Sequence, residues 1–191
     1  MAFIFNVQNY EYLRHAYNQA SLNMRTVEVP IVLDYISKGP RFGYVLEVGN
    51  VLSHYVPATW DIIDQYEEAA GVKNIDIMQV SGGRYELIVS ISTVEHIGYD
   101  KRANTAKYTL IEIVTHIRSL LAPDGKLLIT VPLGFRKDID EAVSADQAAI
   151  GRYMYQSDAV SNSWEQCDLN KALSIKRGRW PLAVAFLEYG R

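Results

Sequence analysis

Two nearly continuous apolar runs of strand length, ELIVSIS (86–92) and KLLITV (126–131), flank one long segment with helical periodicity. In that segment apolar residues recur at helical spacing, at Leu110, Val114, Ile117 and Leu121. Pro123 and an Asp-Gly turn then end it. Strand runs this apolar are typical of strands covered on both faces, as in a parallel sheet. The strand–helix–strand unit therefore predicts an α/β fold.

Shorter apolar runs precede this unit at YVLEV (44–48), WDIID (60–64) and NIDIM (74–78). Strands that alternate with helices favour a doubly wound, mostly parallel sheet with helices on both faces. Only eight residues (79–86) separate the third and fourth runs, which is short for a parallel crossover. We therefore expect the third strand to be stubby or partly irregular.

The two ends of the chain carry other patterns. Residues 6–23 have the aromatic spacing of a polar helix, and residues 26–40 predict a helix with Pro30 in its first turn and a stop at Gly39-Pro40. Near the C-terminus, residues 137–151 predict a helix. Two apolar segments, 162–168 and 182–189, predict an antiparallel pair of strands at one edge of the sheet.

Composition excludes several classes of protein. The chain has 191 residues, 49% of them hydrophobic, which suits one ordinary domain with a full core. Its net charge of -3 gives no electrostatic footprint for nucleic acid or an anionic membrane. Cys167 is the only cysteine, and no apolar stretch approaches the roughly 20 residues of a membrane span. We expect a cytoplasmic-type protein with no nucleic-acid partner and no membrane span.

Polar residues gather where the predicted strands end. The first strand leads into Glu47, Gly49 and Asn50, the second ends at Asp64, and the fourth runs into a Ser-Thr pair. In an open parallel sheet, ligands bind beyond the carboxyl ends of the strands. A pure core does not require this clustering, so the pattern predicts a binding site at that edge.

Gly49 and Asp64 together favour a nucleotide. Gly49 suits a tight turn where backbone approaches a ligand, although a simple turn is an alternative. Asp64 lies seventeen residues after Glu47, near the spacing at which an acid binds ribose hydroxyls, although it could instead cap a helix. The loop GNVLSH has one glycine, with Val51 and Ser53 where a dinucleotide loop needs glycine. This disfavours a nicotinamide cofactor. S-adenosylmethionine has no phosphate and tolerates such a loop.

The segments VLEVGNVLSHY, DIIDQYE, NIDIM, YELIVSISTVEHIGYD and LAPDGKLLITVPLG resemble, in this order, the class I S-adenosylmethionine-dependent methyltransferases. The resemblance covers about residues 42–135, and MRTVEVPIVLDYI resembles the helix that precedes the sheet in several such enzymes. It implies a seven-stranded sheet with an antiparallel C-terminal strand in a single domain, 1–191. That domain would comprise N-terminal helices (1–41), a cofactor-binding core (42–135), and a substrate-side helix with a C-terminal strand pair (136–191).

The resemblance also implies roles for single residues. Glu47, Gly49 and Asn50 would flank the methionine part of the cofactor, and Ser92 would lie beneath the sulfonium. The remaining cofactor contacts would be Asp64 on the ribose with Gln65 and Tyr66 beside it, and Asp76 and Ile77 at the adenine. The chain departs from the family pattern at Val51 and Ser53, and Pro57 cuts the helix after the loop short. A non-catalytic nucleotide-binding or interaction domain of the same fold therefore stays an alternative.

Glu95 and His96 follow the fourth strand and are the candidate catalytic residues. A hydroxyl acceptor needs a base, and histidine is the usual base near neutral pH. His96 could instead cap a helix or pack under the cofactor. Arg25 could bind a substrate carboxylate or pair with Glu28 three residues later. No His, Asp or Glu spacing suggests a metal site. We expect a small hydroxylated molecule or a saccharide as the methyl acceptor.

Overall fold

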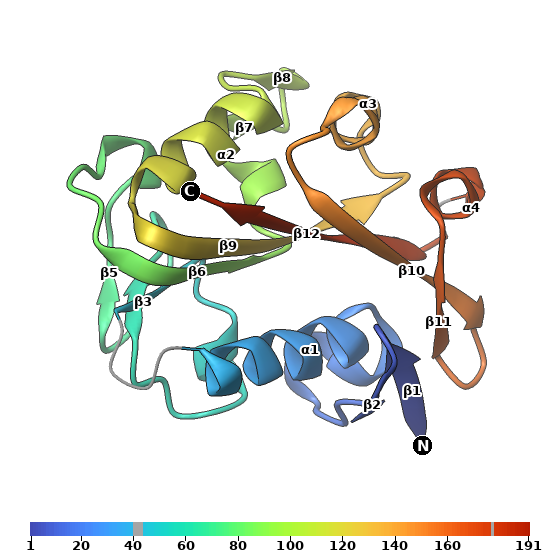
Figure 1. The fold of residues 1–191 in the computed structure, drawn as a ribbon. Helices are drawn as coiled ribbons and strands as arrows, with labels where there is room; N and C mark the ends of the chain where they lie inside the picture. The colour runs from blue at the N-terminus through green and yellow to red at the C-terminus, as the bar shows by residue number, and fades with distance from the viewer. Residues whose placement is uncertain (40–43, 177) are drawn as a thin grey trace.

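An eight-stranded mixed sheet lies between two layers of helices in a computed structural model, which describes residues 1–39, 44–176 and 178–191 (Figure 1). The sheet strands are β3 (Val45–Val48), β4 (Asp61–Ile63), β5 (Val72–Lys73), β6 (Tyr85–Ile91), β9 (Leu121–Leu133), β10 (Ile150–Asp158), β11 (Ser163–Cys167) and β12 (Ala183–Gly190). The helices are α1 (Arg25–Lys38), α2 (Leu110–Ser119), α3 (Lys137–Ala145) and α4 (Leu169–Ser174). Two small hairpins pair β1 (Ala2–Phe5) with β2 (Gln8–Glu11) and β7 (Tyr99–Asp100) with β8 (Thr105–Ala106).

Half of the sheet has the predicted doubly wound order. The strands β5, β4, β3, β6 and β9 lie side by side in that order, and every pair among them is parallel. The strand order reverses between β3 and β6, which is the switch point where doubly wound sheets open a crevice for ligands. The tips of β3 and β6 are therefore the place to look for a site.

The other half of the sheet is antiparallel. As expected, the C-terminal strand β12 is antiparallel, but it lies between β9 and β10. The prediction that 162–168 and 182–189 pair with each other is wrong, because β10 separates β11 from β12. The predicted helix 137–151 ends at Ala145, and β10 makes an eighth strand where seven were expected. In β10 only Met154 is fully buried, so its sequence lacks an apolar run.

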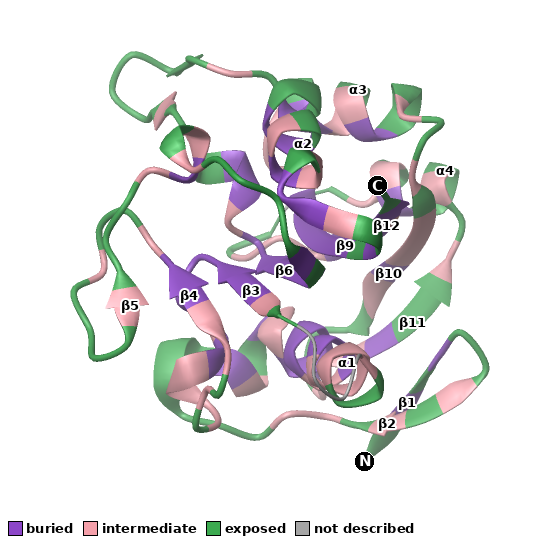
Figure 2. Ribbon diagram, turned by 60° about the vertical axis from the view of Figure 1, so that its left-hand side comes forward, coloured by how far each residue is buried: buried purple, intermediate pink, exposed green. Residues whose placement is uncertain are grey.

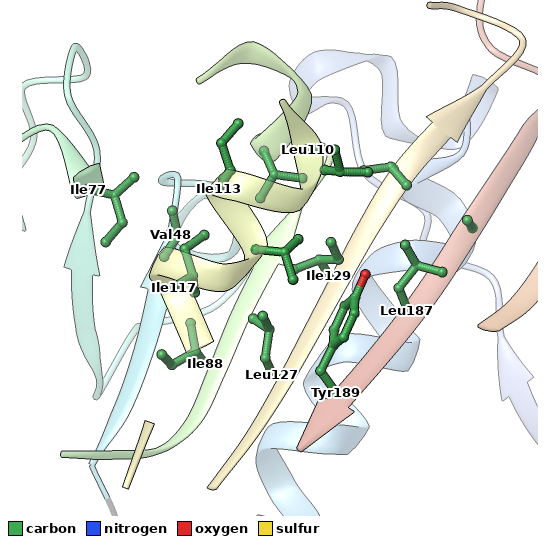
Figure 3. Close-up of a cluster of buried hydrophobic side chains, with 14 of the residues drawn as sticks. Val48, Ile77, Ile88, Leu110, Ile113, Ile117, Leu127, Ile129, Leu187 and Tyr189 are labelled. Atoms are coloured by element: carbon green, nitrogen blue, oxygen red, sulfur yellow. The ribbon is translucent and has the colours of Figure 1, made fainter. Parts of the chain in front are cut away.

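Helices cover both faces of the sheet, as predicted. α1 and the β1–β2 hairpin lie on one face, and α2 and α3 lie on the other (Figure 1). α2 begins with a capping box formed by Thr109 and Glu112, and its apolar stripe packs on the middle of the sheet (Figure 3). Figure 2 shows that β3, β4 and β6 consist largely of buried residues. The apolar strand middles therefore hold the polar strand tips in fixed positions.

The predicted N-terminal helix over 6–23 is wrong. A hairpin and a 3₁₀ helix (Tyr17–Leu22) occupy this segment. Phe3 and Phe5 are buried while Ile4 is exposed, which is the alternation of a strand. Asn6 and Val7 both have positive φ, at 48° and 59°, as the two central residues of a tight hairpin turn require.

The helix predicted after it is confirmed as α1, with Gly39 at its C-terminal cap. Pro30 is not in the first turn but is the sixth residue of the helix. A proline inside a helix leaves the carbonyl four residues earlier without its donor. That carbonyl belongs to Thr26 and accepts the backbone N–H of Leu13 at 3.0 Å instead. Pro40, the other half of the predicted stop signal, lies outside the described residues.

Short connections replace helices on one side of the switch point. A single 3₁₀ turn, Leu52–His54, follows β3, in agreement with the short first helix expected from Pro57. The third strand is stubby, as predicted, but it lies at β5 rather than over 74–78. Residues 77–79 form a 3₁₀ helix instead, capped by the Asp76 side chain, which accepts the N–H of Met78. This part of the crevice is thus built from loops.

Candidate functional site

Two cavities lie beyond the carboxyl ends of the parallel strands, and His96 lines both. The β4-side cavity, of about 220 Å³, is lined by Val48, Gly49, Ile63, Asp64, Gln65, Tyr66, Ile75, Asp76, Ile77, Thr93, His96 and Ile97. The β9-side cavity, of about 280 Å³, is lined by Asn18, Asn23, Met24, Arg25, Ser92, Glu95, His96, Pro132, Phe135, Arg179, Trp180 and Pro181. Small-molecule sites usually have about 300–1,000 Å³. Neither cavity reaches that size alone, and His96 is the lining residue that they share.

The structure brings most of the predicted site residues to these cavities. Six predicted cofactor residues and His96 line the β4-side cavity: Gly49, Asp64, Gln65, Tyr66, Asp76 and Ile77. Ser92, Glu95 and His96 line the β9-side cavity. Glu47 and Asn50 are not among the lining residues of either cavity. Their side chains are buried next to the loop instead.

Glu47 holds the turn after β3. Its Oε1 accepts the backbone N–H groups of Val51 (2.8 Å) and Leu52 (2.7 Å), and its Oε2 accepts Trp60 Nε1–H (2.8 Å). Burial raises the pKa of Glu47, although these three hydrogen bonds oppose the rise. The carboxyl at the tip of this buried strand therefore fixes the loop rather than facing a cavity.

Asp64 holds the same loop from the neighbouring strand. Its Oδ2 accepts Asn50 N–H at 3.0 Å, and its Oδ1 accepts the N–H groups of Tyr66 and Glu67 at 2.9 Å. Burial raises the pKa of Asp64, but these three donors outweigh burial, so the net pKa lies below its usual value. A carboxylate has about four lone-pair positions, so roughly one is left for a ligand.

The backbone conformation and a neighbouring side chain both require glycine at position 49. Its φ is +88°, and an added Cβ would lie 2.3 Å from Thr93 Oγ1. Sequence reasoning gave Thr93 no role, since a threonine after a strand has no distinctive spacing. The next residue, Asn50, donates its side-chain N–H to Glu67 at 2.9 Å. Glu67, which also contacts His54 Nε2 at 2.8 Å, is a second residue that sequence reasoning missed.

A buried polar network ties α1 to the tips of β6 and β9. Glu28 is fully buried, and its Oε1 accepts the hydroxyls of Ser92 (2.6 Å) and Thr130 (2.5 Å). Its Oε2 accepts Arg25 at 3.0 Å, so the pairing of Arg25 with Glu28 is confirmed. Ser92 has φ +41°, an uncommon value for a non-glycine residue. The hydrogen bonds of this network hold Ser92 in place, and constraints of this kind allow an unfavourable backbone conformation to persist.

Glu95 is buried without a hydrogen-bond partner. It is 2% exposed, and neither carboxyl oxygen has such a partner among the described residues. Burial raises the pKa of Glu95 to about 8, so the acid is mostly protonated at neutral pH. His96 Nε2 lies 3.7 Å from Glu95 Oε1. Burial, together with Lys101, Arg136 and Arg25, lowers the pKa of His96, so the ring is neutral at pH 7.

Loops that carry no recognisable motif complete the β9-side cavity. Arg136 donates to the backbone carbonyl of Glu95, and its guanidinium lies 4.0 Å from the ring centroid of Tyr99. Phe135 and Trp180 add aromatic walls. Phe135, Arg136 and Trp180 come from the segments after β9 and before β12, where the sequence shows neither periodicity nor a spacing that could have identified them.

A larger cavity lies at the other end of the sheet. It has about 640 Å³ and lies beside α1, the β1–β2 hairpin and the start of β9. Part of its charged lining is internally paired, since Asp34 accepts both Lys38 Nζ (2.7 Å) and the Tyr10 hydroxyl (2.9 Å). Size alone is therefore a poor guide here, because most of the predicted site residues line the two smaller cavities at the switch point.

Replacing Glu95 with glutamine is expected to stabilise the fold increasingly as the pH rises. The unfolded carboxyl loses its proton near pH 4.5, whereas the folded one keeps it up to about pH 8. Wild-type stability therefore falls between these values, and Glu95→Gln removes that loss. Relative to pH 4.5, the variant should gain about 3 kcal/mol at pH 7, measured by urea unfolding. Glu141→Gln, at an exposed ion pair with Lys137, should show no such trend. An equal trend in both variants would contradict the prediction.

The described residues include no group of three or more His, Cys, Asp or Glu side chains placed to hold a metal ion. Within the same residues, none of the helices combines the length and the apolar composition that crossing a membrane requires.

Comparison with known proteins gives matches among solved structures. No protein-family model and no curated protein matches this chain. It is similar to N-methyltransferase NodS from Bradyrhizobium japonicum WM9 in complex with S-adenosyl-L-homocysteine, with 11% identity, TM-score 0.47 and 78% of each chain covered. It is similar to the Burkholderia thailandensis 1,6-didemethyltoxoflavin N1-methyltransferase with bound S-adenosylhomocysteine, with 14% identity and TM-score 0.44 over 84% of this chain and 75% of that one. The CurJ carbon methyltransferase has 13% identity and TM-score 0.46 over 85% of this chain and 53% of its own.

Proposed function

We propose that this protein is an S-adenosylmethionine-dependent methyltransferase that acts on a small acceptor. The observation that carries the proposal is the pair of cavities at the switch point, both of which His96 lines. A methyl donor in one cavity and an acceptor in the other would place the reacting atoms near His96. Proximity and alignment supply most of the rate of such a transfer.

The loop after β3 fits a cofactor without phosphate. The consecutive N–H groups of Asn50, Val51 and Leu52 all donate to the carboxylates of Asp64 and Glu47. A dinucleotide needs free backbone N–H groups for its pyrophosphate. S-adenosylmethionine carries no phosphate and makes no such demand, so this loop favours it over a nicotinamide cofactor.

The β4-side cavity suits the nucleoside part of the cofactor. The remaining acceptor position of Asp64 would take a ribose hydroxyl, with Gln65 and Tyr66 beside it. Asp76 and Ile77 line the same cavity and would border the adenine. The methionine part would extend past Gly49, whose neighbours Glu47 and Asn50 would act by holding the loop.

The acceptor would bind in the β9-side cavity. When bound, S-adenosylmethionine supplies an electrophilic methyl group on a sulfonium. A hydroxyl acceptor must lose its proton as the new O–C bond forms, and neutral His96 would take that proton on its ring nitrogen. Ser92 would lie beneath the transferring methyl. A small hydroxylated molecule or a saccharide remains the acceptor that we propose.

A thermal-shift panel tests the cofactor assignment. S-adenosylmethionine and S-adenosylhomocysteine are expected to stabilise the protein, by about 2.7 kcal/mol at 100 times the dissociation constant. NAD should give no shift. If neither sulfur nucleoside shifts the transition, the methyltransferase proposal fails. If both bind but no acceptor is methylated, the same fold serves as a binding domain instead.

Asp64→Asn is expected to weaken cofactor binding by about 1–3 kcal/mol, because a buried ribose hydroxyl loses a charged acceptor. The amide still offers one oxygen to the loop. Asp61→Asn, at the opposite end of β4, is the matched control and should leave the affinity unchanged. Titration calorimetry with S-adenosylhomocysteine measures both variants. Equal affinities in folded Asp64→Asn and wild-type protein would move the ribose contact elsewhere.

A further inference from the structure

Glu95 differs from the other buried glutamates in the described part of the chain. Glu28 and Glu47 are each 0% exposed, and each accepts three hydrogen bonds. Glu95 is 2% exposed and lines a cavity, yet neither of its oxygens accepts a described donor. Buried polar groups in native proteins almost always have partners, so an exception calls for an explanation. The simplest one is a ligand that brings the missing donors.

The walls of the β9-side cavity restrict which donors fit. Trp180, Phe135 and the His96 ring line the cavity together with Met24. Aromatic faces attract cations as well as apolar groups. An acid with two free acceptor oxygens in a cavity with aromatic walls matches an ammonium group, which carries up to three N–H donors and a positive charge.

We propose that the β9-side cavity recognises a protonated amine on the acceptor, with the Glu95 carboxylate as its counterion. The acceptor would then be an amino-bearing hydroxyl compound, such as an amino alcohol or an amino sugar. This inference rests on the proposed function only in calling the ligand an acceptor. Glu95 would act as a specificity residue, and His96 would remain the base.

The surrounding charges leave Glu95 available for this role. From α1, the guanidinium of Arg25 pairs with Glu28 at 3.0 Å. From the segment after β9, Arg136 pairs with Asp138. Arg179 is exposed and lies over the Trp180 ring at 5.6 Å. Arg25 and Arg136 are thus matched by other acids. His96 Nε2 lies 3.7 Å from Glu95 Oε1, but its lowered pKa keeps the ring neutral at pH 7, so an amine would find a carboxyl without a charged partner.

Binding of an amine should be coupled to proton release. The empty site holds Glu95 mostly protonated at pH 7, since burial raises its pKa to about 8. An ammonium favours the ionised carboxyl, so the complex should release nearly one proton at pH 7. Affinity should rise about tenfold per pH unit from pH 6 to 7.5 and level off above pH 8. Binding of an anion would instead leave Glu95 protonated and release no proton.

The experiment is titration calorimetry of the cofactor-free protein with benzylamine, benzyl alcohol and benzoate. Wild-type protein should bind benzylamine at least tenfold more tightly than benzyl alcohol, and repeating the titration in two buffers of different ionisation enthalpy should show proton release. Glu95→Gln should lose this preference and its pH dependence. Glu141→Gln, on the exposed face of α3, should keep both.

Three outcomes would overturn the inference. These are tighter binding of benzoate than of benzylamine, equal binding of benzylamine and benzyl alcohol, and benzylamine binding that Glu95→Gln leaves unchanged. Proton release and pH dependence are measured on the wild type, so the test stands even if the variant folds poorly. Because no cofactor is added, failure here is separate from failure of the thermal-shift panel with S-adenosylmethionine.

Discussion

Replacing Glu28 with alanine is expected to lower the free energy of unfolding by about 3–5 kcal/mol. The carboxylate is fully buried and accepts hydrogen bonds from Arg25, Ser92 and Thr130. Without it, the largely buried Arg25 loses its counterion, and two buried hydroxyls lose their acceptor. Ser92 also loses the contact that helps to hold its positive φ. Urea unfolding at pH 7 measures the change.

Two further variants separate this network from an ordinary surface charge. Glu28→Gln keeps an oxygen for the hydroxyls but not the charge for Arg25, so it should fall between wild type and Glu28→Ala. Glu141→Ala removes an exposed ion pair with Lys137 and should cost less than about 1 kcal/mol. A loss below about 1 kcal/mol for Glu28→Ala would mean that the network does not anchor α1 to the strand tips.

The parallel half of the sheet could be predicted because its strands are buried on both faces. β6 and β9 are largely buried, so their nearly continuous apolar runs identify them as strands. The amphipathic helix α2 lies between them in the sequence, which indicates a parallel crossover. The same logic located β3 and β4, whose residues pair in register with each other. Local pattern and tertiary environment agree in these segments.

The chain termini were predicted less well because packing decides their structure. Tyr10 and Tyr12 lie in the segment whose aromatic spacing predicted a helix. Both rings instead lie against Phe3 across the hairpin, at centroid distances of 5.5 and 4.9 Å. β10 is half-buried and polar, and only its partners β11 and β12 make it a strand. Such cross-strand contacts leave no periodic signal in a single sequence.

The candidate site was predictable in position but not in role. Strand ends and spacing brought Asp64, Asp76 and His96 to one edge of the sheet, where the structure also places them. Spacing could not show that the Glu47 carboxylate already accepts three hydrogen bonds from within the protein. Equally, no pattern distinguishes an acid with three donors from Glu95, which has none among the described residues.

His96→Ala is expected to lower the turnover rate by roughly 10²–10⁴ while the cofactor affinity stays nearly constant. His96 lines both cavities, so a base at this position reaches an acceptor in the β9-side cavity, while the ribose contact is assigned to Asp64. Its pKa is lowered by burial and by Lys101, Arg136 and Arg25. A base works in its neutral form, so the wild-type rate should rise with pH along a limb centred below the usual value of about 6.5. The variant should lose that limb.

His96→Gln distinguishes proton transfer from positioning. Glutamine retains hydrogen-bonding groups but cannot accept a proton near neutral pH, so its turnover should fall as far as that of His96→Ala. Single-turnover kinetics with an acceptor that the protein methylates gives the rate, and calorimetry with S-adenosylhomocysteine gives the affinity. Activity restored by glutamine would make His96 a positioning residue. Loss of cofactor affinity in both variants would show that His96 packs under the nucleoside, and that transfer depends on proximity alone.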